Sequence, residues 1–270
     1  MKKNMMLRCV CIFAVLFSFA MPLSAGKKFD SLKEAIKKEA GKDSKKNSGK
    51  ETGKEEKSSK SSKYKRENID TEIWDLSVLD TARDVDYMDE IEKDIVLEMN
   101  MARSNPKKYA ELYIEPRIKK FNGNMYGGKI RTNEGAEVVN ECVKFMNGHK
   151  PLPVFVPSKG LTRAAKDHAD SQSLTDQAGH TGTDGSDPFT RMKRYGSFNG
   201  ASGENISYGS KTAREIVVTL LIDDGVKSRG HRKNIMHKDF TATGIGFANK
   251  HKLYGCECVL DFAAAYKEKE

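Results

Sequence analysis

The segment that decides the fold runs from His168 to His231 and contains four short boxes of glycine and polar residues. They are Gly179-His180-Thr181-Gly182, Ser202-Gly203-Glu204-Asn205-Ile206, Ile222-Asp223-Asp224-Gly225 and Arg229-Gly230-His231-Arg232. Glycine permits sharp turns and close backbone approaches, so each box is predicted to be a loop beside a packed element. Imidazole and carboxylate groups gathered on such loops are typical of a pocket or a metal site.

One helix in this segment suggests how the polar groups meet. Asp223 and Asp224 follow Leu220 by three and four residues, so either can share the buried face of a helix with it. A buried carboxylate is costly unless it meets a donor, and His231 lies only a short loop away. The sequence leaves Asp223 and Asp224 as alternatives. The predicted cluster is His180, Glu204, His231 and one of these two aspartates.

His168 is interpreted differently. Ser158 is a predicted cap for a helix whose apolar face includes Leu161, Ala164, Ala165 and His168. A histidine on an apolar helix face is more often a hydrogen-bonded core residue than a ligand.

The remaining elements follow from periodicity and from breaker residues. Helices are predicted over 88–102, from Pro106 to a stop before Pro116, from about Thr132 to Gly148, over 188–195, and from a Thr212/Glu215 capping box to Asp223. A glycine-rich connection is predicted over 122–128, and an extended crossing at Pro151, Pro153 and Pro157. Strands are predicted over 204–208, 244–248 and 253–263, the last two as a hairpin. Helices first and strands late favour an α+β domain over a parallel doubly wound sheet.

The N-terminal quarter is predicted to lie outside the folded domain. Lys2, Lys3 and Arg8 precede an apolar run that ends near Ala25, which is the pattern of a cleavable signal peptide over residues 1–25. An uncleaved anchor is the alternative. Residues 26–66 are rich in Lys, Ser and Glu and are predicted to be a disordered linker, followed by one domain over 67–270. A secreted or periplasmic location follows.

The net charge of +9 is unevenly distributed. The signal segment contributes +3, and residues 27–66 contribute +8 from 15 basic and 7 acidic residues, so residues 67–270 carry −2. The basic character therefore belongs to the linker. It indicates a solvated spacer, or a weak attraction to anionic surfaces, and no nucleic-acid partner is predicted.

Three cysteines remain beyond the signal segment: Cys142, Cys256 and Cys258. A single bridge from Cys142 to either of the others is one prediction for an oxidising compartment. Three buried thiols are the other, because cysteine is among the most buried residue types.

The paired boxes resemble a known family, the CAP superfamily of cysteine-rich secretory proteins, antigen 5 and pathogenesis-related proteins (SCP-like domains), in its bacterial form. The resemblance covers about residues 85–266. It is carried by Gly179-His180, Gly203–Ile206, Thr212–Glu215, Gly230–Ile235, Phe240–Gly246 and Cys258–Phe262. Two positions depart from the family pattern: an Asp stands where eukaryotic members have Glu, and Leu220 stands where Trp is frequent.

The resemblance implies a three-layer α-β-α sandwich with a small antiparallel sheet, an extracellular setting, and a cleft at His180, Glu204, Asp223 and His231. It favours a non-enzymatic module that binds a lipid, a sterol or a cell-surface ligand. Zn²⁺ or another divalent cation is a further expectation, with the histidines as nitrogen ligands and Glu204 and Asp223 as oxygen partners.

A metal-dependent, peptidase-like hydrolase is one alternative, although there is no His-Glu-x-x-His helix. A purely structural polar network is the other. The oligomeric state is not predicted.

Overall fold

The computed structural model describes residues 64–269. The predicted signal peptide and the linker as far as residue 63 lie outside the described residues. Within 64–269, no helix has the length and apolar character needed to cross a membrane. Tyr64 and Arg66, which the sequence places in the linker, pack on the domain: the Tyr64 hydroxyl donates to Asp94 and the Arg66 guanidinium pairs with Asp80 and Asp94.

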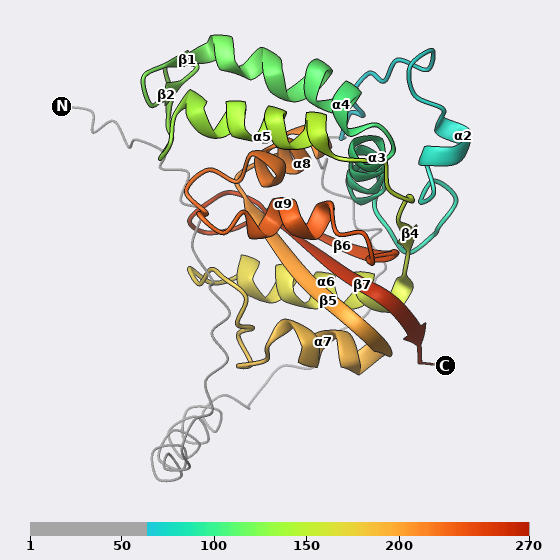
Figure 1. The fold of residues 1–270 in the computed structure, drawn as a ribbon. Coiled ribbons are helices and arrows are strands. Elements are labelled where there is room, and N and C mark those ends of the chain that lie inside the picture. The colour runs from blue at the N-terminus through green and yellow to red at the C-terminus, as the bar shows by residue number, and fades with distance from the viewer. Residues whose placement is uncertain (1–63, 270) are drawn as a thin grey trace, which may run out of the picture. The chain divides into compact units, whose positions relative to one another are not determined.

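The described residues form a three-layer α-β-α sandwich (Figure 1), which confirms the predicted α+β class. The central sheet has the order β4-β6-β7-β5, from β4 (Val156–Pro157), β5 (Gly196–Tyr208), β6 (Ala242–Ala248) and β7 (Glu257–Glu268). The β6–β7 hairpin is antiparallel, as predicted. β5 also pairs antiparallel with β7, whereas the two-residue β4 runs parallel to β6. The last strand, β7, therefore lies between two earlier ones.

Helices cover both faces of the sheet. One layer contains α6 (Lys159–Ser173) and α7 (Pro188–Tyr195). The other contains α3 (Glu90–Ser104), α5 (Ala136–Gly148), α8 (Ala213–Ile222) and α9 (Gly230–Ile235). Their apolar faces bury residues such as Ile95, Val138 and Val217 in one large core cluster on this side of the sheet. The short α2 (Leu76–Leu79) precedes α3.

Local signals account for most of the helix ends. Ser158 caps α6, because its hydroxyl accepts from the Leu161 amide at 3.2 Å. Thr212 caps α8 in the same way, accepting from the Glu215 amide. The predicted reciprocal half of that capping box is absent, since the Glu215 carboxylate instead binds the Arg117 guanidinium in two hydrogen bonds of 2.7 and 2.9 Å.

The segment after α3 differs from the prediction. The helix α4 (Pro106–Tyr109) continues as a π-helical turn η1 (Ala110–Ile114) and a 3₁₀ helix η2 (Glu115–Lys120). Pro116 lies in the first turn of η2, where its missing N–H is not needed, so the chain changes helix type there instead of stopping. The predicted glycine-rich connection forms a small antiparallel sheet of β1 (Phe121–Asn122), β2 (Met125–Tyr126) and β3 (Ile130–Arg131), and α5 begins at Ala136, after the predicted start.

The strand β5 is much longer than predicted. It begins at Gly196, and its glycine-rich first half reads as loop in isolation. The pairing with β7 supplies that half with hydrogen-bond partners from Gly196↔Glu268 onward, with an irregularity between Asn199 and Ser202. Long-range pairing thus overrides weak local strand propensity.

Candidate functional site

A cavity of about 220 Å³ opens between β5, α8, the start of α5 and the small β1–β3 sheet. Apolar side chains form much of its wall: Phe121, Tyr126, Ile130, Val138, Val139, Ile206, Tyr208, Leu220, Ile222 and Tyr254. Three of the four predicted cluster residues, His180, Asp223 and His231, line it, and Glu204 lies directly behind His180. The structure therefore brings the predicted cluster to one cavity.

The buried ion pair between Glu204 and Arg191 holds His180 in place. The His180 Nδ1 lies 2.7 Å from Glu204 Oε1, and the other Glu204 oxygen accepts from the Arg191 guanidinium at 2.7 Å. Burial alone would raise the pKa of Glu204, but the hydrogen bond from His180 and the charge of Arg191 lower it below its ordinary value. Glu204 is therefore an ionised acceptor at neutral pH, and His180 carries its proton on Nδ1.

The loop that presents His180 is fixed from the other side by three side chains. The Gly179 amide donates to the Tyr208 hydroxyl at 2.7 Å, and that hydroxyl donates to Gln172 at 3.1 Å. Gln172 and His168 both donate to the Gly179 carbonyl at 2.9 Å. His168 is fully buried, and burial lowers its pKa to about 4, so it stays neutral. This confirms the prediction that His168 is a hydrogen-bonded core histidine.

His231 forms the second histidine–carboxylate pair. Asp223 ends α8 in a left-handed conformation with φ of 62°, and this turns its carboxylate toward the start of α9. One oxygen lies 2.7 Å from His231 Nδ1, and the other accepts from the His231 amide at 3.0 Å. Asp223 is 1% exposed, so the pair is shielded from water on the carboxylate side.

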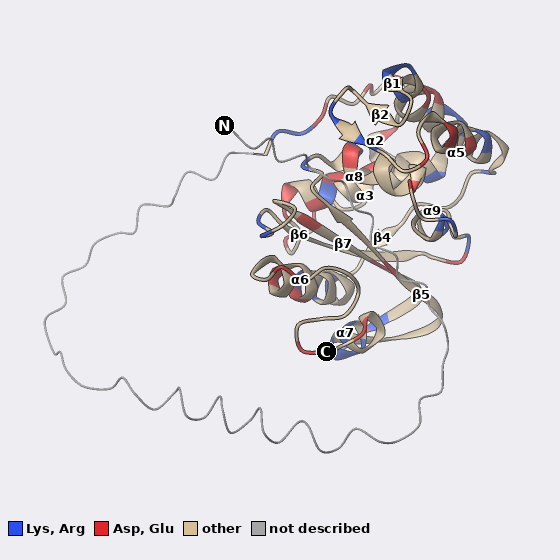
Figure 2. Ribbon diagram, turned by 90° about the vertical axis from the view of Figure 1, so that its left-hand side faces the viewer, with Lys and Arg blue, Asp and Glu red and all other residues tan. Residues whose placement is uncertain are grey.

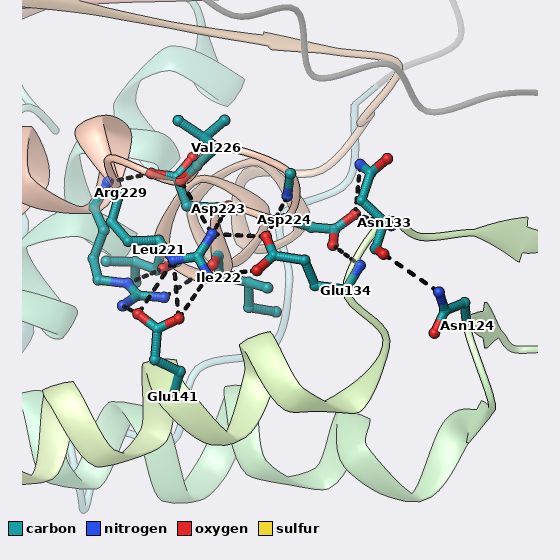
Figure 3. A network of polar contacts seen from close by, with 12 residues as sticks. Asn124, Asn133, Glu134, Glu141, Leu221, Ile222, Asp223, Asp224, Val226 and Arg229 are labelled. Atoms are coloured by element: carbon teal, nitrogen blue, oxygen red, sulfur yellow. Dashed lines mark hydrogen bonds and ion pairs between the residues drawn. The ribbon is translucent and has the colours of Figure 1, made fainter.

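Asp224, the alternative to Asp223, has another role. Its two oxygens accept from the backbone amides of Asn133 and Glu134, each at 2.8 Å. These contacts join the end of α8 to the turn before α5 (Figure 3). Asp223 is thus the carboxylate that meets His231, although both aspartates border the cavity.

The arrangement determines what the site could hold. Both imidazoles use Nδ1 on a carboxylate, and among residues 64–269 neither Nε2 has a hydrogen-bond partner. Carboxylates that hold histidines through Nδ1 are the usual outer partners of metal-binding imidazoles. Within the same residues, however, no group of three or more His, Cys, Asp or Glu side chains is arranged to hold a metal ion. Any cation in this cavity would therefore be held by the two imidazoles alone, and its other coordination positions would be taken by a ligand or water.

Sequence reasoning missed three polar residues around the site. Arg191, on α7, and Tyr208, at the end of β5, gave no local signal, because their partners are distant in sequence. Asp261 did give one, since it is a carboxylate in the otherwise apolar run Cys258–Phe262. It pairs across the sheet with Glu204, is fully buried, and its pKa is raised well above the ordinary value by burial and by the Glu204 charge.

Fold and site together define a class of protein: an α-β-α sandwich whose cavity holds two carboxylate-backed histidines. Residues 122–262, more than half of the chain, match the cysteine-rich secretory protein (CAP) family. The chain belongs to this family, as its paired boxes predicted.

Two bacterial proteins are similar to parts of the chain. It is 33% identical over 109 residues to the uncharacterized protein YkwD of Bacillus subtilis strain 168, a match that covers 40% of this chain and 38% of the relative. The chain thus matches well under half of that relative's length. It is also similar to a crystal structure of an extracellular protein containing an SCP domain from Bacillus anthracis strain Ames, with 21% identity and a TM-score of 0.34 over 42% of this chain and 34% of the other.

Proposed function

We propose that this protein is a secreted, non-enzymatic binding module whose cavity takes the apolar part of a lipid, sterol or other cell-surface ligand. The observation that carries the proposal is the cavity itself, which has an apolar wall at Phe121, Tyr126 and Val139 and polar lining residues that include His180 and His231. Ligand sites combine these features: apolar walls for affinity and a few polar groups for orientation. The N-terminal segment supports secretion.

The cavity volume restricts the ligand. About 220 Å³ is less than the roughly 300–1,000 Å³ of sites that enclose a drug-sized molecule. The cavity therefore has room for only a segment of one acyl chain or one end of a sterol, and the rest of the ligand stays outside. A two-chain phospholipid would have to leave one chain exposed, so single-chain lipids and sterols are the expected ligands.

A cavity-filling variant tests this proposal. Thr219 lines the cavity from α8, so Thr219→Trp should block it, whereas Thr190→Trp places the same ring on the exposed side of α7. Binding of a fluorescent fatty acid, a fluorescent sterol and a two-chain phospholipid is measured for each. We expect the fatty acid or the sterol to bind, with affinity reduced at least about 10-fold in Thr219→Trp and unchanged in Thr190→Trp. Equal binding by both variants, or no binding of any probe, contradicts the proposal.

A divalent cation at the two histidines is a second proposal, favoured by the free Nε2 atoms and their carboxylate-backed Nδ1 atoms. Glu204 and Asp223 would then orient the imidazoles and not ligate the metal. Zn²⁺ titration by calorimetry should show binding that disappears in His180→Ala/His231→Ala. It should persist in His149→Ala/His237→Ala, which removes two histidines outside the cavity. Binding that survives in His180→Ala/His231→Ala, or no binding by the wild-type protein, would reduce the cluster to a polar scaffold.

The hydrolase alternative is weaker on this geometry. Catalytic zinc sites keep three protein ligands and one open position, and this cavity offers two imidazole nitrogens. Absence of Zn²⁺-dependent cleavage across a broad peptide library would remove it.

A further inference from the structure

The loop from Asp223 to Arg229, which joins α8 to the start of α9, is strained at both ends. Asp223 has φ of 62° and Arg229 has φ of 53°, and they are the only non-glycine residues with positive φ among residues 64–269. Such conformations persist only where the surrounding structure holds them in place. The loop must therefore be fixed by specific contacts, and those contacts bear on His231 because it follows immediately.

The Arg229 side chain supplies these contacts. Its guanidinium forms ion pairs of 2.7 Å with Glu134 and 2.6 Å with Glu141, which lie before and within α5. It also donates to the Asp223 and Val226 carbonyls, each at 3.0 Å. Figure 3 shows Arg229 between the loop and α5, with Glu134 and Glu141 directed toward it. One planar group thus joins both ends of the strained loop to a helix of the core.

Glu134 and Glu141 are both charged partners for Arg229. The hydrogen bonds from Arg229 lower the pKa of both Glu134 and Glu141 below their ordinary values, so both are ionised at neutral pH. Glu134 also accepts from the Gly225 amide at 2.8 Å, which ties the middle of the same loop. Arg232 reaches Glu141 as well, at 2.9 Å, while donating to the Leu221 and Ile222 carbonyls.

The contacts continue to the cavity through Asp223. Arg229 holds the Asp223 backbone, and the Asp223 carboxylate holds both the amide and the Nδ1 of His231. Only with Nδ1 protonated and bound to Asp223 does His231 present an unprotonated Nε2 to a ligand or cation. We propose that Arg229 is a positioning residue: braced on Glu134 and Glu141, it holds the Asp223–His231 pair so that the free Nε2 of His231 is presented to the cavity. The inference deepens the proposed binding role of that cavity.

This role requires arginine at position 229, because the side chain must donate hydrogen bonds in several fixed directions at once. Its planar group offers five N–H donors in a fixed fork, and here they reach two carboxylates and two carbonyls at once. A lysine at this position would keep the charge but could not satisfy all four acceptors. Arg229→Lys is therefore a graded variant between the wild type and Arg229→Ala.

The test measures directly which ring nitrogen of His231 carries the proton. Nitrogen-15 NMR distinguishes the Nδ1–H and Nε2–H tautomers of each neutral histidine, and His231→Gln assigns the His231 signals. In the wild-type chain we expect His231 as the Nδ1–H tautomer. Arg229→Ala should give signals averaged toward the Nε2–H form, Arg229→Lys an intermediate shift, and His180 no change. Zn²⁺ should bind Arg229→Ala about 10-fold more weakly than wild type.

A matched control separates positioning from stability. Arg83→Ala removes an arginine that pairs with Asp80, Glu90 and Asp94, away from the cavity, and should leave the His231 tautomer unchanged. If Arg229→Ala does not fold, Glu141→Gln and Arg229→Lys give the same readout. An unchanged His231 tautomer in a folded Arg229 variant overturns the inference, whatever its stability. Absence of Zn²⁺ binding to the wild type contradicts the metal proposal, and the tautomer shift still decides the role of Arg229.

Discussion

At the scale of single residues, the unusual feature is a group of three buried carboxyl groups, on β5 and β7, beside the helical layer of α6 and α7. Glu204 is ionised against Arg191 and His180. Glu257 and Asp261 stand four residues apart on β7, so they share a face, and neither carboxyl has a hydrogen-bond partner among the described residues. Burial and the Glu204 charge raise the pKa of Glu257 to about 8. These two acids are therefore largely neutral at pH 7.

Glu257→Gln should make stability less dependent on pH. In the wild type the folded state keeps the Glu257 proton up to about pH 8, while the unfolded chain loses it near pH 4.3, so stability falls as pH rises through that window. Glutamine removes this loss, which amounts to roughly 3–5 kcal/mol at pH 8. Urea unfolding at pH 5, 6.5 and 8 measures it, with the exposed Glu111→Gln as control. A Glu257→Gln profile parallel to wild type would show that Glu257 is ionised when folded.

The sequence located the site residues to the extent that local rules allow. Loop and helix signals placed His180, Glu204, Asp223 and His231 beside one another, and they left Asp223 and Asp224 unresolved. The left-handed backbone at Asp223 decides between them, and no local signal specifies it. Arg191 and Arg229 could not be assigned because their partners come from other elements.

At the scale of elements, the domain depends on the close packing of α6 on β6. A Cβ atom added at Gly244 would lie 2.1 Å from the Thr162 amide nitrogen, and one at Gly246 would lie 2.4 Å from the Ala165 carbonyl carbon. The helix backbone thus rests directly on the strand at two points. Because α6 carries His168 and Gln172, this contact also sets the position of the loop that presents His180.

Gly246→Ala should destabilise the domain. The new methyl group meets backbone atoms that cannot move aside, so α6 must shift from the sheet, at a cost of about 1–3 kcal/mol. Gly148→Ala is the matched control: it lies at the end of α5 with no atom within 4 Å of the added Cβ, and it should be neutral or slightly stabilising. Urea denaturation of both variants measures the difference. Equal midpoints would mean that α6 and β6 are not in tight contact.

Elements with a strong apolar period were predictable, and those built by distant pairing were not. The helices α3, α6 and α8 follow their sequence pattern and bury the expected faces. The first half of β5, the Glu215–Arg117 pair and the β1–β3 sheet depend on partners that the local sequence does not identify. The predicted α+β class was nevertheless correct, because the apolar periodicity of the helices and the final hairpin are enough to define the layers.

At the scale of the whole molecule, charge is divided between the N-terminal segment and the domain. Residues 27–63 contain 13 basic and 7 acidic residues, whereas residues 67–270 carry −2. Figure 2 shows both signs of charge spread over the helices on either side of the sheet. Any electrostatic attraction to an anionic surface is therefore expected to reside in residues 27–63.

Deletion of residues 27–63 should abolish binding to anionic vesicles. The deletion retains Tyr64 and Arg66, which contact Asp94 and Asp80, so the domain is left intact. The undeleted chain should sediment with phosphatidylserine vesicles at about 10 mM salt and dissociate near 1 M, because the Debye length falls from about 30 to 3 Å. Neutral vesicles are the control. Equal sedimentation by both chains would place the attraction in the domain.

The position of β7 between β5 and β6 has a consequence for biosynthesis. No pair of long strands in the central sheet is complete until residues 257–268 have left the ribosome, since β5 and β6 pair with β7 and not with each other. The β6–β7 hairpin is local, but contacts between segments as far apart as β5 and β7 form late and slowly. The nascent chain consequently stays without its central sheet until β7 has been synthesised. If the protein is exported as proposed above, a chain that still lacks its sheet can thread through an export channel, and folding is then deferred to the far side of the membrane.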